Sequence, residues 1–238
     1  ELPGDVARWS DVRERVRDEI MTKGFDAERG TFTQYYGTTE VDASLLAIPT
    51  VGFLDARDEK FRGTVAAIEE DLMRDGLLLR YRTSTGVDGV AGDESPFLVC
   101  SFWLVSAYSR MGRLDEARAL MDRLVGLCNG VGLLSEEYDV RAARMLGNFP
   151  QAFSHLGLVL AACDLAEVIG TSIGLNLLFG IPLEIGIFIT AADAFLILWL
   201  QNKGVRCLEA LIFGFIVLIF GCFAIQLVLS HPVWGDVL

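Results

Sequence analysis

The sequence has few basic residues and no closely spaced pair of cysteines. The first shortage argues against nucleic-acid binding, and the second against a cysteine-based metal site. Lysine and arginine number 20 against 32 acidic residues, which gives a formal net charge of -12. The basic residues form no stripe or cluster, and this argues against a nucleic-acid interface and against a polybasic lipid-binding patch. The five cysteines form no C-x-x-C pair, and their odd number is typical of free thiols. We therefore expect no nucleic-acid partner, no metal site and no cofactor.

The residues that are present fall into two unlike parts. Residues 1–160 carry 26 of the 32 acidic residues and 18 of the 20 basic ones, whereas residues 161–238 carry six acids together with Lys203 and Arg206. The first part is long enough to bury a core without disulfides. Its first residues are charged, which predicts no signal peptide; they also lack an initiator methionine, and we expect the chain to begin inside a gene. The composition predicts a soluble part followed by a membrane segment.

Apolar residues recur at helical spacing along the first part, and polar loops separate the periodic segments. We expect six helical segments, over residues 5–24, 41–54, 61–76, 95–112, 113–130 and 149–162. The segment 95–112 is apolar enough to be buried on all sides. The expected fold class is all-α, an array of helical hairpins whose loops carry the function at one end.

Two loops hold candidate site residues. Loop 79–97 contains Arg80 and Tyr81, a forked donor and a flat ring with a polar tip that together suit a hydroxyl-rich ligand. Loop 132–155 contains Glu136 and Glu137, which can raise each other's pKa and act as acid or base. From composition alone, a solvated loop and a charged helix cap stay open as alternatives. We expect His155, on an apolar helix, to be a hydrogen-bonded core residue and not a catalyst.

Several motifs in order make residues 1 to about 160 resemble the carboxyl-terminal half of the glycoside hydrolase family 15 catalytic domain, the glucoamylase and trehalase group. They read "GFDAERGTFTQYYG", "EVDASLLAIP", "LRYRT", "ESPFLVCSFWL", "GRLDEARAL", "GLLSEEYD" and "LGNFPQAFSHLGL". The resemblance implies a partial α/α toroid of the six-hairpin type that hydrolyses α-glucosidic bonds with inversion.

The same resemblance assigns roles to individual residues. It implies that Glu136 is the catalytic base, that Arg80 and Tyr81 bind the sugar and that Glu137 lies in the sugar-binding wall. The family's general acid lies in a "GIWE"-type motif, and this motif is absent from the sequence. We therefore expect an α-glucoside or oligosaccharide as ligand, but no hydrolysis by this chain alone.

The second part contains three apolar stretches, at residues 156–180, 183–201 and 207–229. Each has about the twenty residues that a transmembrane helix needs, so we expect three transmembrane helices in a lipid bilayer. The two basic residues of this part fall in the loop "QNKGVR". The positive-inside tendency places this loop, and with it the soluble part, in the cytoplasm of a multi-pass membrane protein.

Asp164 and Glu167 lie three residues apart on one face of the first stretch. Carboxylates inside a membrane mark proton or cation pathways, and juxtamembrane acids that reach water stay open as the alternative.

The motifs "ACDLAEVIGTSIGLNLLFGIPL", "GIFITAADAFLILWLQNKGVRCLEA" and "GCFAIQLVL" resemble the third to fifth transmembrane helices of the Nramp divalent metal transporters. The resemblance implies that Asp164, Glu167 and Glu209 belong to a proton pathway, with protons and divalent manganese or iron as further partners. The family's "DPGN" and "MPHN" metal-binding motifs are absent, so we expect no transport by this part alone.

The domain boundary is expected between residues 160 and 161, with the junction inside 157–163. We expect two incomplete activities in one chain: a hydrolase fragment fused to a transporter fragment. The alternatives are a metal transporter or an inactive, membrane-anchored carbohydrate-binding module. Because no linker separates the parts, we expect a recombined, truncated or misassembled reading frame, with a natural fusion as the alternative.

Overall fold

The computed structural model describes residues 4–83, 86, 89 and 94–182, with 185, 213, 214, 216, 217, 220 and 221 beyond them. The chain divides into two compact units, Glu1–Ile169 and Gly170–Leu238. Most of the described residues belong to the first unit.

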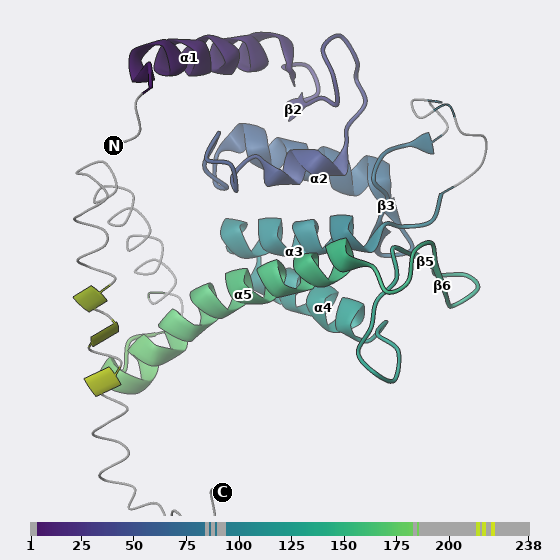
Figure 1. Cartoon of the computed structure of the whole chain (residues 1–238), viewed down its shortest axis with the longest axis vertical. Coiled ribbons are helices and arrows are strands. Elements are labelled where there is room, and N and C mark those ends of the chain that lie inside the picture. The colour runs from purple at the N-terminus through teal and green to yellow at the C-terminus, as the bar shows by residue number, and fades with distance from the viewer. Residues whose placement is uncertain are drawn as a thin grey trace, which may run out of the picture. The chain divides into compact units, whose positions relative to one another are not determined.

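The described part is mainly helical (Figure 1). Its helices are α1 (Val6–Lys23), the 3-10 helix η1 (Ala43–Ala47), α2 (Glu59–Leu72), α3 (Leu98–Met111), α4 (Leu114–Val125) and α5 (Ala152–Phe179). Local chemistry sets their ends. Asp5 caps α1 by accepting a hydrogen bond from the Arg8 backbone N–H at 3.0 Å, and Asp58 caps α2 in the same way. Helix α3 ends at Gly112, whose φ of 81° is the left-handed conformation that glycine adopts at low cost.

Three short hairpins lie between the helices in the described residues, and the all-α expectation did not include them. They pair β1 (Phe25–Asp26) with β2 (Thr31–Phe32), β3 (Met73–Arg74) with β4 (Leu77–Leu78), and β5 (Glu137–Asp139) with β6 (Arg144–Leu146). The first and third hairpins turn in the same way, because Asp26 and Asp139 each accept two backbone N–H groups of the following turn. The third hairpin contains Glu137, and β4 of the second hairpin leads to Arg80 and Tyr81.

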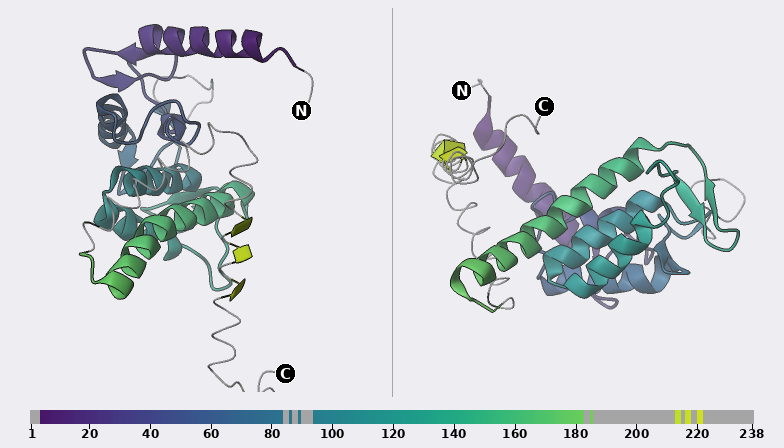
Figure 2. Two further views of the ribbon diagram at one scale, coloured as in Figure 1. Left: turned by 90° about the vertical axis from the view of Figure 1, so that its left-hand side faces the viewer. Right: turned by 90° about the horizontal axis from the view of Figure 1, so that it is seen from below.

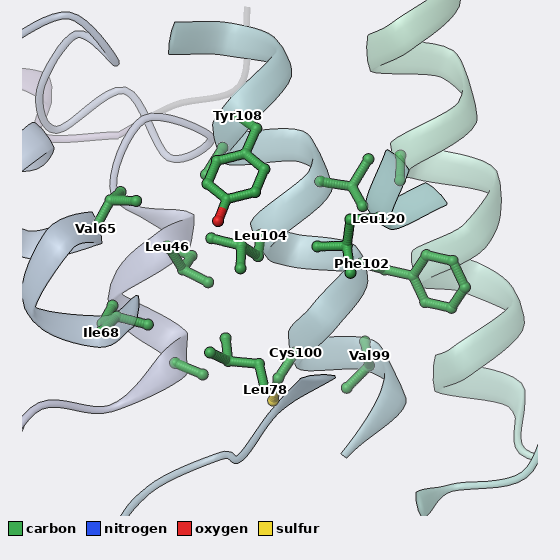
Figure 3. Close-up of a cluster of buried hydrophobic side chains, with 14 of the residues drawn as sticks. Leu46, Val65, Ile68, Leu78, Val99, Cys100, Phe102, Leu104, Tyr108 and Leu120 are labelled. Atoms are coloured by element: carbon green, nitrogen blue, oxygen red, sulfur yellow. The ribbon is translucent and has the colours of Figure 1, made fainter. Parts of the chain in front are cut away.

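Helix α3 is the centre of the core, with ten of its fourteen residues buried, which confirms the prediction for segment 95–112. Figure 3 shows Phe102, Leu104 and Tyr108 of α3 among side chains from η1, α2, β4 and α4. Full burial of one such apolar side chain contributes about 1.5–3 kcal/mol. Helix α5 lies against α3 at Gly157, where an added Cβ would lie 3.1 Å from the Cβ of Phe102 (Figure 2). Helix α3 therefore fixes the positions of the segments that surround it.

Helix α1 forms where its periodicity predicts a helix, but it has no buried residue. The apolar side chains at its helical spacing are exposed, among them Trp9 at 61% and Val6 at 67%. Its contact with the rest of the unit includes Arg17, whose guanidinium donates to the Phe53 carbonyl at 2.5 Å and lies over the Phe53 ring. The apolar face of α1 is thus largely uncovered in the described structure.

The expectation of three transmembrane helices is wrong. No helix among the described residues is long and apolar enough to cross a membrane. The first apolar stretch lies in α5, whose Ala161 and Leu165 are buried in the protein core, while other apolar side chains of the same helix, such as Leu177 and Phe179, are exposed. Stretches 183–201 and 207–229 fall almost entirely outside the described residues. The cytoplasmic placement of the first part depended on these helices and has no support from the described structure.

Candidate active site

Four chain segments meet at the amino-terminal end of α3. The Leu98 backbone N–H donates to the Glu136 carbonyl at 2.9 Å, and the Phe97 N–H donates to the Leu78 carbonyl at 3.1 Å. The Ala43 N–H donates to the Arg80 carbonyl at 2.8 Å. These bonds bring the predicted site residues of both loops to the amino-terminal end of α3.

Glu136 is half-buried and is held by Asn148. Its Oε2 accepts hydrogen bonds from the Asn148 backbone N–H at 3.0 Å and from the Asn148 Nδ2 at 2.8 Å. Its backbone N–H donates to the Asn148 carbonyl at 3.0 Å. Within the described residues no group donates to Oε1. The carboxylate is therefore fixed through one oxygen and keeps the other available to accept a proton.

Gly147 makes room for the Glu136 side chain. Its φ is +71°, and a Cβ added there would lie 2.7 Å from the Glu136 Oε2 and 2.9 Å from the Glu136 Cβ. Only a residue without a side chain fits both the backbone conformation and the contact. The sequence analysis did not identify Gly147 or Asn148; the adjacent Gly-Asn pair within "LGNFPQ" was the available signal.

Glu137 begins strand β5 beside Glu136 and is half-buried. Burial raises the pKa of the Glu137 carboxyl above its usual value, and the negative charges of Glu94 and Glu136 raise it further, against a hydrogen bond from the Ser95 backbone that lowers it. The expectation that clustered carboxylates raise a pKa here is confirmed for Glu137. Glu94, which belongs to the predicted loop 79–97, lies close enough to contribute.

Arg80 and Tyr81 follow strand β4. The Arg80 side chain is exposed, and its guanidinium carbon lies 5.3 Å from the centre of the Tyr81 ring. This cation-π contact orients the fork of Arg80, while the Tyr81 ring is nearly buried. Among the described side chains, no ion pair joins Arg80 to Glu136. The N–H donors of Arg80 are therefore not paired with the Glu136 carboxylate, which lies at the same end of α3.

A cavity of about 400 Å³ opens beside these loops. Its lining includes Leu79, Arg82, Glu94, Pro96, Asp139 and Arg141. Charged side chains of both signs line it, but its lining does not include Arg80, Tyr81, Glu136 or Glu137. In the part of the chain that the structure describes, no three His, Cys, Asp or Glu side chains are placed to hold a metal ion.

His155 is hydrogen-bonded through both ring nitrogens, as the sequence analysis expected of a core histidine. Its Nε2 accepts from the Leu134 backbone N–H at 3.3 Å, and its Nδ1 lies 2.7 Å from the Gln151 carbonyl oxygen.

Two of the three predicted proton-pathway residues, Asp164 and Glu167, lie on α5 within the described residues. The Asp164 carboxylate forms an ion pair with Arg110 at 2.9 Å, and the Asp164 carbonyl accepts from the Ser109 hydroxyl at 3.1 Å. Asp164 thus joins α5 to α3. Glu167 is exposed, and Glu209 lies outside the described residues.

The helical fold of this unit agrees with the comparisons to known proteins. Residues 1–163 match the model of the family described as glycosyl hydrolases family 15, and the chain belongs to this family. A trehalase from Thermoplasma acidophilum is 44% identical over 167 residues, which cover 70% of this chain and 28% of the trehalase. A solved glycosidase structure has a TM-score of 0.56 and 21% identity over 67% of this chain and 44% of the glycosidase, a likeness of fold.

The carboxyl-terminal part matches a second family. Residues 131–238 match the model described as natural resistance-associated macrophage protein-like. A divalent metal cation transporter, MntH, from Brucella suis is 58% identical over 81 residues, which cover 34% of this chain and 18% of the transporter. The two matched ranges overlap at residues 131–163. The chain spans less than a third of the length of either relative.

Proposed function

We propose that residues 1–160 form the base-bearing half of an inverting α-glucosidase of the trehalase type. The observation that carries this proposal is the geometry of Glu136. Asn148 holds Oε2 with two hydrogen bonds, and none of the described residues donates to Oε1. An ionised carboxylate held in this way can take a proton from a water molecule as that water attacks a sugar carbon, which is the role of a general base.

The remaining site residues take supporting roles in this proposal. Arg80, oriented by the Tyr81 ring, donates paired hydrogen bonds to sugar hydroxyls. Glu137 lines the wall beside the base. Because burial and its neighbours raise the pKa of Glu137, this carboxyl keeps a proton to higher pH and can donate it to a hydroxyl. The base and the arginine would then contact one sugar from the same end of α3.

Hydrolysis with inversion needs a second carboxylic acid on the far side of the bond, about 6.5–9.5 Å from the base. The sequence holds no "GIWE"-type motif to supply it. We therefore propose that an amino-terminal half of a family 15 enzyme supplies the acid and that this chain is active only in its presence. The similarity to a trehalase supports trehalose, or a related α-glucoside, as the substrate.

The test is complementation with the amino-terminal half of a family 15 trehalase. The mixture should hydrolyse trehalose, and Glu136→Gln should lower kcat by about 10²–10⁴-fold, the usual contribution of a general base. Glu70→Gln, which removes a similar charge from an exposed position on α2, should leave the rate unchanged. Activity that persists in Glu136→Gln would remove the role given to Glu136. Calorimetric heat with trehalose but no turnover would favour the alternative, an inactive carbohydrate-binding module.

A second function is supported by the 58% identity to a divalent metal cation transporter. We propose that residues 161–238 are a membrane-associated fragment of a proton-coupled transporter, with Asp164, Glu167 and Glu209 in its proton pathway. The ion pair of Asp164 with Arg110 competes with that role in this chain. Manganese uptake by a complemented assembly should fall in Asp164→Asn and in Glu167→Gln, and uptake that both variants leave unchanged would exclude the pathway.

A further inference from the structure

The first turn of α5 holds the backbone just before Glu136. The Gln151 backbone N–H donates to the Leu134 carbonyl at 2.9 Å, and the Ser154 hydroxyl donates to the Ser135 carbonyl at 2.7 Å. Leu134, Ser135 and Ser154 are all fully buried. Buried backbone groups without partners are costly, so these bonds fix the course of the chain toward the carboxylate.

His155 supplies the remaining bond to this segment. The Leu134 N–H donates to Nε2 at 3.3 Å, while Nδ1 lies 2.7 Å from the Gln151 carbonyl oxygen. A carbonyl oxygen can only accept, so Nδ1 carries the proton and Nε2 keeps the lone pair that accepts from Leu134. The ring is therefore the neutral Nδ1–H tautomer, and it joins the helix to the loop.

We infer that His155 is a positioning residue for Glu136, and this inference rests on the proposed role of Glu136 as the base. Leu134 is two residues before Glu136, whose own backbone is fixed by Asn148 on one side and by Leu98 on the other. The Leu134 N–H donates to His155 Nε2, and among the described residues it has no other hydrogen-bond acceptor. Loss of the His155 ring leaves the buried Leu134 N–H without an acceptor, and this loosens the start of the segment that holds Glu136.

Two substitutions separate the bond to the loop from the bond within the helix. His155→Gln keeps an acceptor at about the reach of Nε2, so that it can still receive the Leu134 N–H. His155→Asn keeps a donor at the place of Nδ1 but cannot reach Leu134. The chain has one other histidine, His231, and His231→Asn is the matched control for the change in composition.

The experiment measures amide hydrogen exchange and ring tautomer in the full chain. Exchange at Leu134 and Glu136 should be at least tenfold faster in His155→Asn and close to wild type in His155→Gln and His231→Asn. Nitrogen-15 spectra of the labelled histidines should show the His155 ring, assigned by its loss in His155→Gln, protonated at Nδ1. Unchanged exchange at Glu136 in His155→Asn, or a ring protonated at Nε2, would overturn the inference.

Kinetics distinguish this inference from the proposed function. In the complemented enzyme, kcat should fall at least tenfold in His155→Asn with KM within about twofold, and His155→Gln should recover most of the loss. If Glu136→Gln leaves the activity of the complemented enzyme unchanged, Glu136 is not the base and the proposed function fails. The amide exchange data would still show whether His155 holds the backbone before Glu136. Faster exchange at Glu136 in His155→Asn without any loss of kcat would overturn the positioning role.

Discussion

Replacing Gly147 by alanine is expected to disturb the candidate base more than any ordinary glycine substitution would. The new Cβ would lie 2.7 Å from the Glu136 Oε2 and 2.9 Å from the Glu136 Cβ. Rotation of the carboxylate relieves the first contact but not the second, so the Glu136 backbone must move. An alanine at positive φ costs about 1–2 kcal/mol, and weakening the Asn148 bonds to the carboxylate adds about 1–2 kcal/mol.

Gly132→Ala is the matched control for the backbone cost. Gly132 has a φ of +77° with nothing within 4 Å of an added Cβ, so alanine there should cost only the conformational part, about 1–2 kcal/mol. Urea denaturation of the full chain, followed by circular dichroism, measures both losses. Gly147→Ala should be the less stable variant by about 1–2 kcal/mol, with faster amide exchange at Asn148. Equal losses and unchanged exchange would refute the packing of Glu136 against Gly147.

Three further outcomes are expected. Folding raises the pKa of Glu137, so its contribution to stability is complete below its unfolded-state pKa and is lost as pH rises through its folded-state pKa. In Glu137→Gln the denaturation midpoint should therefore vary less with pH between these two pKa values, and the variant should be more stable than wild type at neutral pH. Gly157→Val should lower the free energy of unfolding by about 1–3 kcal/mol, because the new side chain pushes α5 away from α3. Gly170→Ala is the control: nothing lies within 4 Å of an added Cβ, so thermal unfolding should show a gain of up to about 1 kcal/mol in helix stability. Asp164→Asn should cost about 0–1 kcal/mol, since its partner Arg110 is partly exposed; a larger loss in the same assay would mean a stronger role in holding α5.

The helices could be predicted where periodicity and capping agree, and less well elsewhere. The expected segment 5–24 became α1 almost residue for residue. Segment 41–54 formed only η1, because Pro49 cannot donate within a helix and Gly52 turns the chain at a φ of +70°. The hairpin of β3 and β4 was readable in principle. Asp75 and Gly76 both have positive φ, and an Asp-Gly pair between apolar residues is a strong hairpin signal.

The apolar stretch in α5 shows why hydropathy misled the fold prediction. Ala161 and Leu165 are buried in the protein core, and periodicity alone does not distinguish a helix that faces a protein core from one that faces lipid. Asp164 reads as an intramembrane acid in the sequence, whereas its partner Arg110 is 54 residues away. The folded chain brings these two residues together, and their separation in the sequence gives no indication of the ion pair.

The site was foreseeable only in part for the same reason. The resemblance pointed to Glu136, Glu137, Arg80 and Tyr81, and the fold places all of them at the amino-terminal end of α3. The groups that fix Glu136 come from distant segments, with Asn148 twelve residues later in the chain. The Gly-Asn pair marks a turn, but composition and spacing do not show that Asn148 contacts Glu136, because this contact depends on how β6 and α5 return to the loop.

The most direct test of the central claim is the anomeric form of the glucose first released from trehalose by the complemented chain, read by proton magnetic resonance before mutarotation. If Glu136 activates water on the face opposite the leaving group, each bond cleaved should yield one β-glucose and one α-glucose in equal amounts. Release of α-glucose alone would mean retention, and would contradict the assignment of Glu136 as the base of an inverting hydrolase.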